Sequence, residues 1–234
     1  MQGESRLTNR DFCVYYGHDP AQITHLLNFE LVVVESRGWD PESWKKLIDG
    51  PGKVLGYIST FAWPDWMGKT RWWWGPKERD ESWNAWWLSL NSRGWRRRVE
   101  KMWRELPQGL DGLFFDNLDR LQDDPKSLKP LKNLLKQVRT EWPEAILMGN
   151  RGFAHWSSLD AHLDGILFEN MTDQSFSPGD RKWVEEQLQG LLNTSVYALD
   201  YHTRRVPQEA ERLKSLYPKM KYYCAPDEGL QSLA

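Results

Sequence analysis

The chain has 234 residues and a formal net charge of −2, with 31 basic residues against 33 acidic ones. This near balance gives no overall field that would attract nucleic acid, so we expect no nucleic-acid partner. No apolar run approaches the 18 or more residues that a membrane span requires, so we expect no membrane partner either.

Eight short apolar runs alternate with helical patterns from one end of the chain to the other. Each run is rich in β-branched or aromatic residues and is nearly continuous in apolar character. This composition is typical of strands that are buried on both faces of a parallel sheet. The predicted strands cover residues 12–17, 31–36, 53–60, 112–117, 145–150, 165–170, 195–201 and 221–226.

The segments between these runs carry helix signals. An Asp or Ser stands directly before a proline at residues 19–20, 40–41, 124–125 and 177–178, which predicts a capped helix start at each place. Residues 127–139 place five apolar side chains on one stripe at helical spacing. Eight strand–helix units predict an α/β fold, a closed (β/α)8 TIM barrel in a single domain over residues 1–234, with strands one and eight hydrogen-bonded. An open doubly wound sheet is the alternative.

Tryptophan is unusually frequent, and its distribution is uneven. Nine of the fifteen tryptophans lie between Trp63 and Trp95, mostly in an insert after the third predicted strand that covers residues 61–91. Loops of this length in a compact domain are usually functional or disordered, and aromatic enrichment argues against disorder. Flat indole faces suit the C–H faces of sugars. Most of these rings are expected to pack a lid, and we take Trp63 and Trp66 as the candidates for contact with a saccharide.

Two predicted strands end in matching motifs. Residues 111–117 read DGLFFDN and residues 164–170 read DGILFEN, so each glycine is followed by three apolar residues, a carboxylate and an asparagine. Because side chains alternate along a strand, Asp116 shares a face with Phe114, and Glu169 with Leu167. If that face points into the barrel, both carboxylates reach its mouth from strands about 10 Å apart. Their side chains can close this gap to the separation used by glycosidase carboxylate pairs.

Active sites of such barrels lie at the carboxyl ends of the strands. Polar residues stand at the carboxyl ends of most of the other predicted strands. They include Tyr16, Glu35, Ser59, Asn150 and Asp200. This convergence of polar groups supports a site at the mouth.

Other chemistries have weaker signals. The chain contains no nucleophile-elbow motif, no HExxH motif and no phosphate-binding P-loop. Cys13 and Cys224 form no metal-type spacing, and neither do the five histidines, so we expect no metal and no organic cofactor. Two alternatives remain open. One is a non-catalytic saccharide-binding barrel, in which the carboxylates are too far apart or paired with arginine. The other is a barrel enzyme that holds a phosphorylated metabolite through Arg204 and Arg205.

The segments GLDGLFFDNLDRL (109–121) and LDGILFENMT (163–172) resemble the signature strands of glycoside hydrolase family 114, the endo-α-1,4-polygalactosaminidases and their barrel relatives. The resemblance covers most of the chain. It implies a glycoside hydrolase that acts on α-1,4-linked galactosamine polysaccharide, with Asp116 and Glu169 in the catalytic positions. We expect Asp116 to be the nucleophile and Glu169 the general acid/base of a retaining enzyme.

The same resemblance implies that further residues bind the substrate. We add Glu35 and Tyr57, on predicted strands two and three, to the residues that it implies. The residues implied by the resemblance are Tyr16, Asn117, Asp119, Asn150 and Asp200. Because an unacetylated amino-sugar polymer is cationic, we expect Glu35, Asp119 and Asp200 to make the mouth acidic together with the catalytic pair. We also expect a monomer. The resemblance favours secretion or the cell envelope, although residues 1–10 lack the apolar core of a signal peptide.

Overall fold

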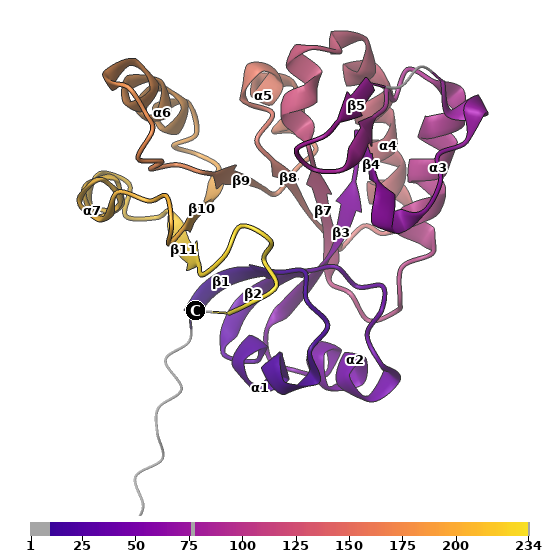
Figure 1. Cartoon of the computed structure of the whole chain (residues 1–234), viewed down its shortest axis with the longest axis horizontal. Helices are drawn as coiled ribbons and strands as arrows, with labels where there is room; N and C mark the ends of the chain where they lie inside the picture. The colour runs from indigo at the N-terminus through magenta and orange to yellow at the C-terminus, as the bar shows by residue number, and fades with distance from the viewer. Residues whose placement is uncertain (1–9, 76–77, 234) are drawn as a thin grey trace, which may run out of the picture.

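The computed structural model describes residues 10–75 and 78–233. Within them, eight parallel strands form one sheet that curls into a nearly closed barrel, with helices on its outside (Figure 1). The strands, in their order around the sheet, are β1 (Arg10–Tyr15), β2 (Phe29–Val34), β3 (Lys53–Ser59), β7 (Gly112–Asp116), β8 (Ile146–Asn150), β9 (Gly165–Glu169), β10 (Ser195–Tyr201) and β11 (Lys221–Ala225). The predicted (β/α)8 TIM-barrel fold is therefore confirmed. The expectation about a signal peptide depends on residues 1–9, which lie outside the described residues.

The barrel closes between its first and last strands by side-chain packing. Phe12 of β1 and Tyr223 of β11 meet edge to face with ring centroids 6.0 Å apart. Beyond β11 the tail returns to β1, where the Tyr16 backbone N–H donates to the Leu230 carbonyl at 2.7 Å. The described residues show no paired register between β1 and β11, so the predicted hydrogen bonding between these strands is not confirmed.

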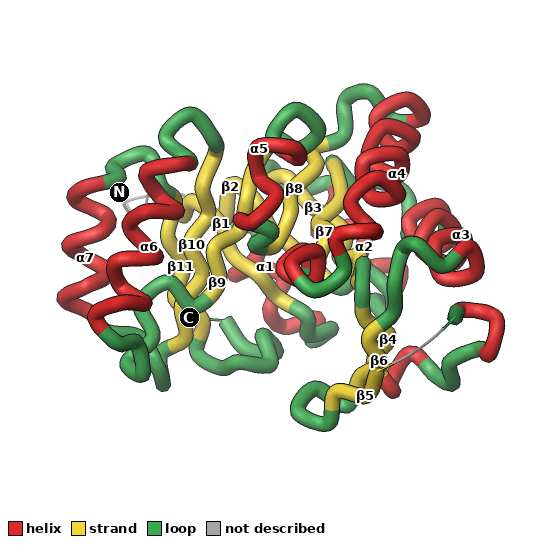
Figure 2. The backbone as a smooth tube through the Cα atoms, turned by 90° about the horizontal axis from the view of Figure 1, so that it is seen from above, coloured by secondary structure: helices red, strands yellow, loops and turns green. Residues whose placement is uncertain are grey.

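Seven α-helices are described, and the longer ones cover the outer face of the sheet (Figure 2). In α4, four residues of the predicted stripe are buried against the sheet, and Leu131 and Leu135 are fully enclosed. Asp40 caps α2, and a capping box formed by Ser177 and Asp180 starts α6. None of the described helices is both long and apolar enough to cross a membrane. The helices are α1 (Ile23–Leu26), α2 (Pro41–Ile48), α3 (Arg93–Arg104), α4 (Leu128–Glu141), α5 (Trp156–Leu159), α6 (Pro178–Gly190) and α7 (Pro207–Leu216).

Successive side chains along each strand point alternately into the barrel and out toward the helices, so they contribute to two separate hydrophobic cores. Phe114 and Leu167 are buried in the barrel interior together with Met148 and Leu199 from neighbouring strands. Phe115, one residue along, belongs instead to the core between the sheet and α4. Asp116 and Glu169, two positions after Phe114 and Leu167, therefore share the inward face and emerge at the mouth of the barrel.

The tryptophan-rich segment between β3 and α3 forms a small antiparallel sheet, set apart from the barrel strands in Figure 2. Its three strands are β4 (Ala62–Pro64), β5 (Glu78–Asp80) and β6 (Ala85–Trp87). Trp63 is 4% exposed and packs against Trp74 and Trp95, with centroids 4.8 and 6.0 Å away. Trp66, by contrast, is 64% exposed. Some indoles thus build the core of the insert and others face solvent, while residues 76 and 77 lie outside the described part.

Candidate active site

Three adjacent strands end in the residues that form the centre of the site. Asp116 is the last residue of β7, Asn150 of β8 and Glu169 of β9. The chain turns sharply after each of them, because the next residue has a positive φ: 65° at Asn117, 60° at Arg151 and 55° at Asn170. Asparagine adopts this left-handed conformation more readily than most residues, which accounts for the asparagine after each carboxylate.

The Asn150 side chain joins the two carboxylates. Its Nδ2 donates to Asp116 Oδ1 at 2.7 Å and to Glu169 Oε2 at 2.9 Å. Because both oxygens accept from one nitrogen at these two distances, they lie no more than about 5.6 Å apart. Asn150 is buried, and its Oδ1 has no hydrogen-bond partner among the described residues.

Two tyrosines and one backbone amide complete the hydrogen bonds to the pair. Tyr57 OH donates to Asp116 Oδ2 at 3.0 Å, and the Asn117 N–H donates to Asp116 Oδ1 at 2.7 Å. Tyr201 OH donates to Glu169 Oε1 at 2.6 Å. Burial raises the pKa of both phenols, and the nearby carboxylates raise it further, so both remain neutral donors. All four carboxylate oxygens of the pair thus accept at least one hydrogen bond.

The pKa of Asp116 is raised from its ordinary value to about 6, chiefly by burial and then by the negative charge of Glu169. The hydrogen bonds from Asn150, Asn117 and Tyr57 lower the pKa and so oppose part of this rise. A carboxyl group with this pKa is mostly ionised at neutral pH and takes up a proton in mild acid.

Tyr16 lies at the same mouth, half-buried, with its ring 4.8 Å from the ring of Tyr57. Burial raises the pKa of Tyr16, and the charge of Asp116 is the next largest cause. The structure therefore brings Tyr16, Tyr57 and Asn150 together with the carboxylate pair. Asp119 is exposed just beyond β7, 3.6 Å from the guanidinium of Arg151.

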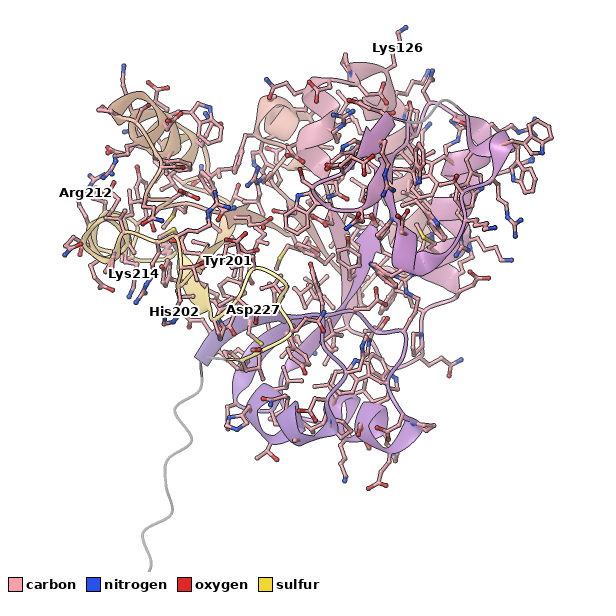
Figure 3. The ribbon with its side chains drawn as sticks, in the orientation of Figure 1. Lys126, Tyr201, His202, Arg212, Lys214 and Asp227 are labelled. Carbon is pink, nitrogen blue, oxygen red and sulfur yellow. The ribbon has the colours of Figure 1, made fainter. Side chains whose placement is uncertain are left out.

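The sequence analysis predicts Asp200 at the site, whereas the structure places Tyr201 there. Asp200 is 1% exposed and points away from the mouth, where it accepts from the Thr172 hydroxyl at 2.6 Å and from Tyr222 OH at 3.0 Å. Leu199 lies in the barrel interior, and alternation from it places Tyr201 rather than Asp200 on the inward face. Figure 3 shows Tyr201 at the end of β10. Asp200 therefore lies outside the group of side chains at the mouth, contrary to the expectation from the sequence.

Two further predicted contacts are enclosed. Glu35 is 4% exposed and is bound by Arg37, whose Nε and Nη2 lie 2.7 and 2.6 Å from its two oxygens. This ion pair removes Glu35 from the expected negative charge of the mouth. Trp63 is buried in the insert, and its indole N–H donates to the Gly68 carbonyl at 2.6 Å. Neither side chain offers a surface to a ligand.

The insert nevertheless borders the mouth. The guanidinium of Arg37, which follows β2, lies 5.8 Å from the ring centre of Trp66. Arg120, which follows β7, lies 4.7 Å from the ring centre of Trp87 and pairs with Glu78 at 2.7 Å. The insert thus contacts the loops after two barrel strands at their carboxyl ends.

The arginines around the mouth have acidic partners other than the central pair. Arg120 pairs with Glu78 and with Asp123, and the side-chain ion pair of Arg151 is with Asp119. Arg204 pairs with Asp173 at 2.7 Å and reaches Glu228 at 3.5 Å. These pairs count against a phosphate site at Arg204 and against neutralisation of Asp116 and Glu169 by arginine. The described residues contain no group of three or more side chains that could hold a metal ion.

The raised pKa of Asp116 predicts a stability effect. Above pH 6 the buried carboxylate destabilises the fold, because the same group ionises near its ordinary pKa of 3.8 in the unfolded chain. We expect Asp116→Asn to raise the free energy of unfolding at pH 7 by about 2–3 kcal/mol. The gain should shrink as the pH falls through 6 and vanish below pH 3.8, which urea titrations of both proteins can measure. A gain that does not depend on pH would contradict this origin.

Comparisons with known proteins agree with the barrel fold. The chain resembles the glycoside hydrolase domain of PelA from Pseudomonas aeruginosa, with 21% identity, a TM-score of 0.73 and coverage of 95% and 96% of the two chains. It also resembles Aspergillus fumigatus Ega3 in complex with galactosamine, with 13% identity, a TM-score of 0.70 and coverage of 93% and 90%. No curated protein matches the sequence. The family model for glycoside-hydrolase family GH114 matches residues 9–227, and the chain belongs to that family.

Proposed function

We propose that this protein hydrolyses α-1,4-linked galactosamine-containing polysaccharide, with Asp116 and Glu169 as its catalytic residues. The observation that carries the proposal is the bridge from Asn150 Nδ2, which holds one oxygen of each carboxylate at 2.7 and 2.9 Å. Membership of GH114 supports the reaction class. The likeness to PelA and to the galactosamine complex of Ega3 supports the substrate class.

We assign the nucleophile to Asp116. Three donors hold its carboxylate in place, and at neutral pH it is mostly ionised. In the first step its oxygen bonds to the anomeric carbon while Glu169 gives its proton to the departing glycosidic oxygen. In the second step Glu169 takes a proton from water, and the water oxygen displaces Asp116 from the anomeric carbon.

The separation of the carboxylates supports retention of configuration. Retaining glycosidases place their two carboxyl groups about 5–5.5 Å apart, whereas inverting enzymes need roughly 6.5–9.5 Å to admit a water molecule. The shared donor at Asn150 holds the nearest oxygens of this pair within about 5.6 Å, on the retaining side of that division.

The sugar next to the pair has a defined set of neighbours in this proposal. Tyr16 and Tyr57 form an aromatic edge beside the pair. Asp119 and Trp66 lie further out, at the rim. Asn117 acts through its turn and its backbone N–H rather than through a direct contact. Because one chain supplies both carboxylates and all their donors, we propose a monomer without a cofactor.

A substrate screen tests the function. Incubation with unacetylated α-1,4-galactosamine oligomers should release new reducing ends, and the first product seen by NMR should have the α configuration. Cleavage should weaken as salt rises, because a cationic polymer meets solvated carboxylates such as Asp119 at the rim. Fully acetylated oligomers and neutral α-1,4-galactose oligomers serve as matched controls. No hydrolysis, or equal rates on the neutral oligomers, would contradict the proposal.

A further inference from the structure

A pocket of about 340 Å³ has Glu169 in its wall but not Asp116. Its other walls come from the loop after β8, from the segment between β9 and α6, from α6 itself and from Arg204. This volume lies near the lower end of the range of about 300–1,000 Å³ that is typical of small-molecule sites. The pocket therefore continues the catalytic cleft on one side of the carboxylate pair.

An aromatic cluster forms one wall of this pocket. Trp183 on α6 stands edge to face against Phe153 and Phe168, with ring centroids 5.5 and 5.9 Å away. The two phenylalanine rings are 4.4 Å apart and support the indole from behind. Trp183 is still 44% exposed, so it presents a fixed apolar surface to a ligand. The C–H face of a pyranose ring packs on such a surface.

The charged groups of the pocket favour an amino sugar. Hydrogen bonds from Ser177 hold the pKa of Asp180 below its usual value, so Asp180 is ionised at neutral pH. Asp173 is neutralised by Arg204, and Arg151 pairs with Asp119 outside the pocket. Asp180 has no basic partner among the described residues. It is thus available to an ammonium group of the ligand.

We infer that this pocket is a second sugar subsite, which holds another hexosamine unit of the polysaccharide against Trp183 with its amino group toward Asp180. The identity of the sugar rests on the proposed function. Because the general acid Glu169 protonates the departing oxygen, the unit in this pocket belongs to the leaving part of the chain. Affinity should then depend on whether a ligand extends past the cleavage point onto Trp183.

Binding measurements in an Asp116→Asn background test this, because Asp116 does not line the pocket and bound oligomers remain intact. Galactosamine and its unacetylated α-1,4-linked oligomers of two to seven units are titrated into this protein with and without Trp183→Ala. We expect Trp183→Ala to weaken binding of every oligomer that spans both subsites, the dimer included, about tenfold, and to leave the affinity for the single sugar, which can bind beside Asp116 alone, within about twofold. Trp72→Ala, which removes an indole that is 83% exposed in the insert, is the matched control and should change nothing at any length.

Three results would overturn the inference. They are an unchanged affinity for every oligomer, an equal loss for the single sugar and for the oligomers, and an absence of binding by the Asp116→Asn protein itself. The comparison does not depend on turnover. If the wild-type protein cleaves none of these oligomers, the proposed function fails. The binding measurements then still show whether the pocket at Trp183 holds a sugar. If the wild type cleaves them but Trp183→Ala binds and cleaves like the wild type, the subsite alone is wrong.

Discussion

Asp116→Asn and Glu169→Gln should each lower kcat on galactosamine oligomers by at least about 10³-fold. Both changes are nearly isosteric and remove only the ionisable group. General acid–base catalysis alone is typically worth about 10²–10⁴ in rate, and loss of the nucleophile usually costs more. Initial rates of reducing-end release measure the effect. Circular dichroism should show that both variants are folded, and Asp116→Asn should be more stable than the wild type at pH 7.

Matched substitutions and chemical rescue make this result specific. Asp49→Asn directly after α2 and Glu211→Gln on α7 change exposed carboxylates away from the mouth and should keep the wild-type rate. Azide should rescue the two alanine variants differently. With Asp116→Ala it attacks the substrate directly and gives the β-glycosyl azide, whereas with Glu169→Ala it attacks the covalent intermediate and gives the α-glycosyl azide. Exchanged products would reverse our assignment of roles, and wild-type rates in either isosteric variant would rule out this pair.

Asn150→Asp should produce the second largest loss, about 10²–10³-fold in kcat/KM at pH 7. The change keeps the shape of the side chain but replaces the donor shared by Asp116 and Glu169 with a third carboxylate. Loss of a stabilising hydrogen bond and gain of a like charge both raise the pKa of Asp116 further. The nucleophile is then protonated over a wider pH range.

The pH profile separates this effect from simple damage to the fold. In the wild type, kcat/KM should rise as the pH increases through about 6, because a carboxyl with that pKa must lose its proton to act as a nucleophile. In Asn150→Asp this acidic limb should move to higher pH. Asn150→Ala, which removes the donor without adding charge, should shift it less. Asn193→Asp, at an exposed position before β10, is the control. An unmoved limb in Asn150→Asp would show that Asn150 does not set the pKa of the pair.

Local patterns in the sequence predict the barrel, and they predict that Asp116 and Glu169 lie at the ends of inward-facing strand positions. Strand assignment depends on local alternation and on apolar continuity, which do not require knowledge of distant contacts. The same alternation placed Asp116 with Phe114 and Glu169 with Leu167 on the inward face, and the packing of those apolar side chains agrees. The asparagines after both carboxylates were visible in the sequence, although their role in left-handed turns required the backbone.

The accessibility of nearby side chains, and the hydrogen bonds that hold the pair together, depend on contacts between distant parts of the chain. Trp63 and Trp66 look alike in the sequence, yet packing against Trp74 and Trp95 buries the first and leaves the second exposed. Burial and hydrogen bonding depend on segments far apart in the chain, which local patterns do not encode. For the same reason the bridge from Asn150 and the pocket at Trp183 emerge only where β8, β9 and α6 converge in space.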